Sequence, residues 1–182
     1  MATARGHGKV EGPTLPMTSS TGKRGATSHT VERGRAEDEM NRIVVGIDGS
    51  EASQRALHWA VEEARAHGAT VAAVHGWLGP AAAMYSLGAI PIDPDLFREA
   101  AREVLDKAIA SIDDADLVKP LEAKLVEGGA SHVILEEALD ADLVVVGSRG
   151  RGGFAGLLLG SVSQQVVHHA TCPVLVIPAP PH

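Results

Sequence analysis

Five short apolar segments, separated by longer amphipathic ones, constrain the fold of this chain more than any other feature. Apolar runs of about five residues are typical of buried strands, and apolar residues that recur every three or four positions are typical of helices. The third run alternates apolar and polar residues, which predicts a half-exposed strand near a sheet edge. The expected strands are 43–47, 71–75, 121–127, 142–146 and 174–177.

Strands that alternate with helices form a parallel sheet with helices on both faces, because parallel strands need right-handed crossover connections. The sequence therefore predicts a doubly wound α/β domain. Ser50 is placed to cap the first helix and Gly68 to end it. Ligands of such sheets bind beyond the carboxyl ends of the strands, where the winding reverses. If the first strand is central, that point lies between the first and fourth strands.

Residues 1–40 differ in composition from the rest of the chain. They are rich in Gly, Ser, Thr, Arg and Lys and have no helical or strand period, so we expect a disordered N-terminal extension. Residues 41–182 then form the folded domain. A mis-assigned start, an expression remnant and a real arm are all compatible with the composition of the extension.

Charge and composition exclude several classes of partner. The formal net charge is −7, and the first 40 residues carry +1, which leaves −8 on the domain. Aromatic residues make up 3% of the chain, so we expect no nucleic-acid partner, which would require a basic stripe or a stacking platform. The single cysteine excludes an intramolecular disulfide. We expect no membrane partner and a cytoplasmic location, because no apolar run could span a bilayer and no signal peptide is visible.

A glycine-rich loop connects the fourth expected strand to the last helix. It reads Gly147-Ser148-Arg149-Gly150, followed after nine residues by Gly160-Ser161. A strand, a glycine-rich loop and a helix start form a cradle for an anionic group, because glycine lets the backbone approach closely and can adopt positive φ. The amides and the dipole of the helix start favour negative charge. The pattern predicts a phosphate or nucleotide site.

Each of these features also has a purely structural interpretation. Ser161 and Gln164 match a Ser-x-x-Gln capping box, which would use the serine hydroxyl without any ligand. Arg149 and Arg151 are either solvated surface charges or local positive charges for a phosphate.

Asp48 ends the first expected strand and precedes Gly49. An Asp-Gly pair is common in turns, but a carboxylate at the switch point could also accept from a ribose hydroxyl or help to hold a metal ion on phosphates. No lysine follows Lys124, which excludes a P-loop around the glycines. No nucleophile with an adjacent base is apparent, so we expect no enzyme beyond a weak ATPase.

Three separated motifs resemble one known family. The segment Gly147-x2-Gly150-x9-Gly160-Ser161 is similar to the ATP-binding signature of the universal stress protein family. Two further segments also resemble that family. One is the first expected strand with the residues after it, Ile43-Val44-Val45-Gly46-Ile47-Asp48-Gly49-Ser50, and the other is the last expected strand with its flanks, Cys172-Pro173-Val174-Leu175-Val176-Ile177-Pro178. The resemblance covers residues 41–178 and identifies the chain with the ATP-binding subclass.

The resemblance implies strand order 3-2-1-4-5 with ATP, or a related adenine nucleotide, at the switch point. It implies that Gly46 and Asp48 meet the adenosine end, that Gly76 contacts adenine through its backbone, and that Gly147 lies by the ribose. Mg²⁺ or Mn²⁺ are candidate companions of the phosphates. The implied phosphate-binding residues are Gly150, Gly160 and Ser161, with Ser148, Arg149, Arg151 and Val162 nearby.

The family also implies a homodimer through the last strand, residues 173–178. An apolar edge strand is an aggregation liability unless it is paired, which agrees with this expectation. The implied function is a cytoplasmic stress-response protein that senses or signals through nucleotide occupancy. A slow metal-dependent ATPase or phosphotransferase using Asp48, and a nucleotide-free interaction scaffold, are the two alternatives.

Overall fold

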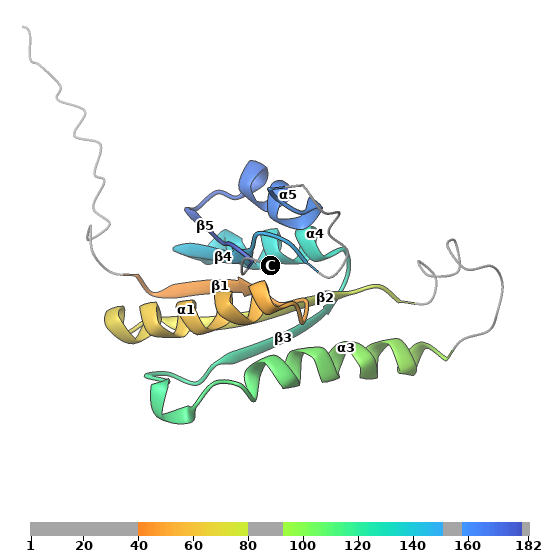
Figure 1. The fold of residues 1–182 in the computed structure, drawn as a ribbon, viewed down its shortest axis with the longest axis horizontal. Helices are drawn as coiled ribbons and strands as arrows, with labels where there is room; N and C mark the ends of the chain where they lie inside the picture. Colours follow the sequence, from red (N-terminus) through yellow and green to blue (C-terminus); the bar gives the residue numbers. More distant parts are fainter. Residues whose placement is uncertain (1–39, 80–92, 151–157, 180–182) are drawn as a thin grey trace, which may run out of the picture. The chain divides into compact units, whose positions relative to one another are not determined.

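The computed structural model describes residues 40–79, 93–150 and 158–179 (Figure 1). The expected extension, except Met40, and most of the long loop after the second strand lie outside these ranges, as does Arg151. The elements are β1 (Arg42–Gly46), α1 (Glu51–His67), β2 (Thr70–Trp77), α3 (Pro94–Ile109), η1 (Asp114–Asp116), β3 (Glu122–Glu127), α4 (Ala130–Glu137), η2 (Ala138–Asp140), β4 (Leu143–Gly147), α5 (Ser161–His169) and β5 (Val174–Ile177).

The strands form one parallel sheet in the order β3-β2-β1-β4-β5, which confirms the expected fold class. The central strand β1 pairs on both sides: Val45 lies opposite Ala73 of β2 and Val145 of β4. Along the chain, β2 and β3 are added to the sheet on one side of β1, and β4 and β5 are then added on the other side. The winding therefore reverses between β1 and β4, as the sequence predicts.

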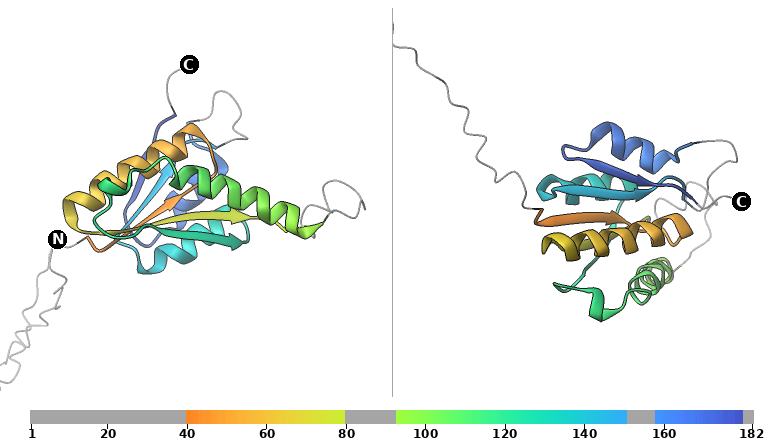
Figure 2. Two further views of the ribbon diagram at one scale, coloured as in Figure 1. Left: turned by 90° about the horizontal axis from the view of Figure 1, so that it is seen from below. Right: turned by 60° about the vertical axis from the view of Figure 1, so that its left-hand side comes forward.

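Each face of the sheet carries its own apolar core, because successive strand residues point to opposite faces. One core joins Val45 and its same-face neighbours to helices α1 and α3, and the other joins Val44 and its neighbours to α4 and α5 (Figure 2). The fully buried Leu57 of α1 and Leu105 of α3 belong to the first core. The third strand has no fully buried residue, in agreement with its alternating sequence and its edge position.

The ends of α1 form as the sequence predicts. Ser50 Oγ accepts a hydrogen bond from the amide of Ser53 at 3.2 Å, and Gly68 closes the helix with φ of 68°, a conformation that favours glycine. Two leucines at positions where the apolar spacing would favour a buried helix face are not buried. Leu96 in the first turn of α3 is 58% exposed, and Leu139 is 69% exposed because α4 ends at Glu137 and the chain continues as the short turn η2.

A polar cluster ties the strands together at their amino ends, opposite the expected ligand site. The guanidinium of Arg42 pairs with Glu122 at 2.6 Å and with Glu137 at 3.0 Å, and all three side chains are partly buried. Although burial opposes the charged form, these two carboxylates raise the pKa of Arg42 above its usual value. The backbone amides of Asn41 and Arg42 also donate to the carboxylate of Asp142, at 2.8 and 3.1 Å.

Candidate functional site

The carboxyl ends of β1 and β4 bring Asp48 and Gly150 into contact. A methyl group built on Gly150 would collide with the Asp48 carboxylate, so only glycine fits beside that oxygen without a shift. More than a hundred residues of chain separate these two positions. The structure therefore places the strand-end carboxylate against the glycine-rich loop, at the point where the winding of the sheet reverses.

Local hydrogen bonds hold the Asp48 carboxylate in place. Its Oδ1 accepts from the amide of Ser50 at 2.9 Å and from the Ser50 hydroxyl at 2.6 Å. Gly49 lies between them with φ of 76°, which an ordinary residue rarely adopts. The Asp-Gly turn is thus real, but it engages Oδ1, whereas Oδ2 is the atom that faces Gly150. The turn therefore holds the carboxylate with Oδ2 on the side of Gly150.

Close packing, rather than unusual backbone angles, explains most glycines of the site. The described glycines with positive φ do not include Gly147, Gly150 or Gly160, so a left-handed backbone is not the property of glycine that these three use. A Cβ on Gly147 would lie 2.9 Å from the Cβ of Ala52 in α1. A Cβ on Gly76 would lie 2.9 Å from Cα of Ala130 at the start of α4. These glycines let helices approach the strand ends.

Ser148 is committed to contacts within the protein. It is 6% exposed; its amide donates to the carbonyl of Ile177 at 2.7 Å, and its hydroxyl oxygen accepts from the amide of Ala179 at 3.0 Å. Arg55 of α1 donates to the carbonyl of Pro178 at 3.1 Å. The residue after β4 is therefore attached to the end of β5 and to the segment that follows it, so the start of the glycine-rich loop is tied to the edge of the sheet.

The start of α5 differs from the expected capping box. Ser161 is the first helical residue, the N-cap is Gly160, and no side chain caps the helix. The Gly160 amide is also not open to a ligand, because it donates to the carbonyl of Ser148 at 2.7 Å. Ser163 stabilises this junction: its buried hydroxyl lies 2.9 Å from the Ser148 carbonyl and 3.0 Å from that of Gly160.

The next amides of α5 are the ones with the geometry of an anion site. The first helical hydrogen bond runs from Gln164 to the Gly160 carbonyl at 2.9 Å, so the amides of the preceding residues in the first turn have no partner of that kind. Among the described residues, the amides of Ser161 and Val162 donate to no acceptor. A Cβ on Gly160 would lie 3.6 Å from its nearest atom, Cα of Arg149, so the described residues leave room for a side chain at the position before these amides.

Two side chains near the site were not found from the sequence. Ser163 could have been noticed as a hydroxyl three residues after the loop glycine. His75, two residues before the end of β2, had no sequence signal: its Nδ1 lies 2.7 Å from the carbonyl of Ile47, the residue before Asp48. Arg149 is half-buried after the loop's first turn and carries a charge of the sign expected near phosphates.

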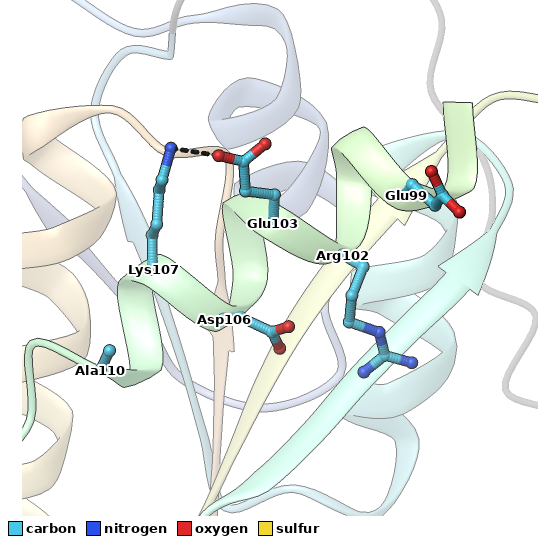
Figure 3. Close-up of a pocket in the computed structure, with 6 residues that line it drawn as sticks. All are labelled: Glu99, Arg102, Glu103, Asp106, Lys107 and Ala110. Atoms are coloured by element: carbon cyan, nitrogen blue, oxygen red, sulfur yellow. Dashed lines mark ion pairs between the residues drawn. The ribbon is translucent and has the colours of Figure 1, made fainter. Parts of the chain in front are cut away.

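No other arrangement in the described ranges competes with this site. The groove in Figure 3 lies along the outer face of α3 and is lined by exposed charges, with an ion pair of 2.6 Å between Glu103 and Lys107. Across residues 40–79, 93–150 and 158–179, no three His, Cys, Asp or Glu side chains are gathered as a metal site would need. Within the same ranges, no helix is long and apolar enough to cross a membrane.

A doubly wound parallel sheet with a carboxylate, a glycine-rich turn and open helix amides at its switch point defines the class of small α/β domains with a nucleotide-type site. The family model of the universal stress protein family matches residues 39–178. The chain belongs to that family.

The comparisons with individual proteins agree with this assignment. A universal stress protein of Mycolicibacterium smegmatis is 38% identical over 145 residues, which cover 78% of this chain and 47% of the relative. The chain thus spans about half the length of the curated relatives it matches. Among solved structures, a universal stress protein in complex with cAMP is 29% identical with a TM-score of 0.52, covering 77% of this chain and 98% of that one. One from Archaeoglobus fulgidus in complex with dAMP is 25% identical with a TM-score of 0.51, covering 77% and 98%.

Proposed function

We propose that this domain binds ATP or a related adenine nucleotide at the junction of β1, β4 and α5. The observation that carries the proposal is the contact between the Asp48 carboxylate and Gly150, a loop residue that lies next to Gly160 at the start of α5, where the amides of Ser161 and Val162 donate to no acceptor among the described residues. The solved relatives in complex with cAMP and dAMP support an adenine nucleotide as the ligand class.

In this proposal the two ends of the site have different chemistry. Asp48 accepts from a ribose hydroxyl through the oxygen that faces Gly150, while Gly46, Gly76 and Gly147 line the adenosine end. The phosphates lie over Gly150 and Gly160 and accept from the amides of Ser161 and Val162, with Arg149 and Arg151 supplying positive charge. The domain is acidic overall, so these local donors, rather than a long-range field, must hold the anion.

A divalent ion, Mg²⁺ or Mn²⁺, fits this site as a companion of the phosphates. The described residues gather no protein cage for a metal, and the Asp48 carboxylate contacts the loop at Gly150. The ion would neutralise charge on neighbouring phosphate oxygens, and the carboxylate would act on it indirectly.

We further propose that nucleotide occupancy is a cytoplasmic stress signal transmitted through the edge of the sheet. The Ser148 contacts to Ile177 and Ala179 connect the glycine loop to the end of β5. A homodimer through residues 173–178 would place that connection at the subunit interface. Ordering of the loop by the nucleotide would then shift the population of a partner-binding surface.

The proposal is tested by asking what the purified protein holds. Mass analysis of the small molecules released by denaturation should identify an adenine nucleotide. Isothermal titration of the emptied protein with ATP, AMP and cAMP, with and without Mg²⁺, should give saturable binding to at least one of them. Absence of binding to all three would refute the proposal in favour of a scaffold. ATP turnover above background that is lost in Asp48→Ala would favour the ATPase.

A further inference from the structure

The peptide unit between Ile47 and Asp48, just after the end of β1, is held by a side chain of β2. The last pair of the β1–β2 ladder is Gly46 with Val74, and the amide of Ile47 still donates to the Val74 carbonyl at 2.8 Å. A continued ladder would next join the Ile47 carbonyl to the backbone of β2. Instead, that carbonyl accepts from the imidazole of His75 at 2.7 Å.

The partner of His75 determines which ring nitrogen carries the proton. A carbonyl oxygen only accepts, so a hydrogen bond of 2.7 Å requires a proton on Nδ1. In the neutral ring, Nε2 is then the acceptor, which is the less common of the two neutral forms of histidine in water. The bond therefore selects a tautomer, and the tautomer is observable.

We propose that His75 is a positioning residue for the Asp48 carboxylate. The Ile47 carbonyl and the Asp48 amide belong to one planar peptide unit, so fixing the carbonyl fixes the plane from which Asp48 projects. The other side of that unit is held less tightly, because the Asp48 amide donates to Ser53 Oγ at 3.4 Å. His75 thus takes over the role of the ladder at the point where β1 leaves the sheet for the turn that aims Asp48.

This inference rests on the proposed function for its meaning, because it assigns to His75 the orientation of a ligand-binding carboxylate. A half-buried ring within β2 could instead serve only to fill space. The two roles differ in what can replace the histidine. Filling space needs volume, whereas positioning needs an N–H at the place of Nδ1.

A set of variants separates these roles. In His75→Asn the N–H of the side-chain amide lies the same number of bonds from Cβ as Nδ1 does in histidine. In His75→Gln it lies one bond further from Cβ, and His75→Leu has no side-chain N–H. We expect ATP affinity, measured by isothermal titration, to fall about tenfold in the Leu and Gln variants, the worth of one lost hydrogen bond, and to stay within about twofold in Asn. His67→Leu is the matched control, since its Nδ1 also lies against a backbone carbonyl, 3.0 Å from that of Glu63, at the other end of α1.

Two results would overturn the inference: an affinity of His75→Asn for ATP as low as that of His75→Leu, or an affinity of His75→Leu equal to that of the unsubstituted protein. A second measurement needs neither variants nor nucleotide. The ¹⁵N shifts of neutral His75 in the full chain should report a proton on Nδ1, and a proton on Nε2 would also overturn it. If the unsubstituted protein binds no nucleotide, the proposed function fails, whereas a proton on Nε2 of a protein that does bind nucleotide leaves that function standing and removes the role of His75.

Discussion

The substitution Gly160→Asp separates the stability of the domain from its affinity for an anion. Gly160 is the N-cap of α5, its φ of −78° suits any residue, and a Cβ built there meets no atom closer than 3.6 Å. An aspartate at an N-cap accepts from amides of the first helical turn. In this helix those are the amides that we assign to the phosphates, so the new carboxylate is an intramolecular competitor of the ligand.

The expected effects have opposite signs. The capping bond and the interaction of the carboxylate with the helix dipole should stabilise the fold by about 0.5–1 kcal/mol, which raises Tm by about 1–4 °C for a domain of this size. The same carboxylate repels a phosphate at about 4 Å with roughly 4 kcal/mol at an effective dielectric constant of 20. Affinity for ATP should therefore fall by about a thousandfold.

The assay pairs thermal unfolding with isothermal titration on the same preparations. Gly160→Asn is the control, because it offers a cap of the same shape without the charge, and it should lose much less affinity than the aspartate variant. An aspartate variant that is folded and binds ATP within threefold of the unsubstituted protein would refute the assignment of the α5 amides. A variant with a large fall in Tm would refute the claim that the position is open.

Four further outcomes are expected. Gly147→Ala should lower the free energy of unfolding in urea by about 1–3 kcal/mol, because its Cβ would overpack against α1; an unchanged midpoint would contradict this packing. Arg42→Met should destabilise the domain by about 1–2 kcal/mol in the same assay, because it removes the cation that pairs with Glu122 and leaves Glu137 with Lys124, at 3.3 Å, in place of two cations. Burial, with a contribution from Asp142, raises the pKa of the Cys172 thiol, so alkylation at pH 8 should be slower than that of a free thiol and should accelerate only at higher pH. Val176→Pro should yield a folded monomer by light scattering. The β4 ladder uses the carbonyls of Pro173 and Ile177, so the backbone amide of Val176 points away from β4 and toward the partner strand of the proposed dimer. A persistent dimer would exclude pairing through this edge.

The fold was predictable because its signals are local and repeated. A fully buried parallel strand such as β1 or β4 must be almost continuously apolar, and the expected bounds differ from the observed ones by a residue or so. Leu96 and Leu139 show where this reasoning stops. Their periodicity fits a helix face, but burial depends on where the helix ends and on what covers it, and neither is encoded in the spacing of apolar residues.

The site was predictable only as a location. Gly-rich sequence after a strand indicated the switch point, and the structure brings Asp48 to Gly150 there. Which polar groups are used internally was not predictable, since the Ser148 and Gly160 partners come from segments whose relative positions only the folded chain defines. The expected capping box is an instance: Ser161 caps nothing, and Ser163, two positions later, provides the anchoring hydroxyl.

The glycines of the site show why a signature of this kind contains two sorts of constraint. A Cβ on Gly147 or Gly76 would clash with backbone atoms of a neighbouring helix, and one on Gly150 would displace the Asp48 carboxylate, so contacts within the protein account for these three glycines without a ligand. Gly160 has no such requirement in the described structure, because its angles and its surroundings would accept a side chain. A residue that the fold does not need to be glycine is the one whose smallness a ligand can explain. Substitutions at Gly160 therefore test binding, whereas substitutions at the other three test packing first.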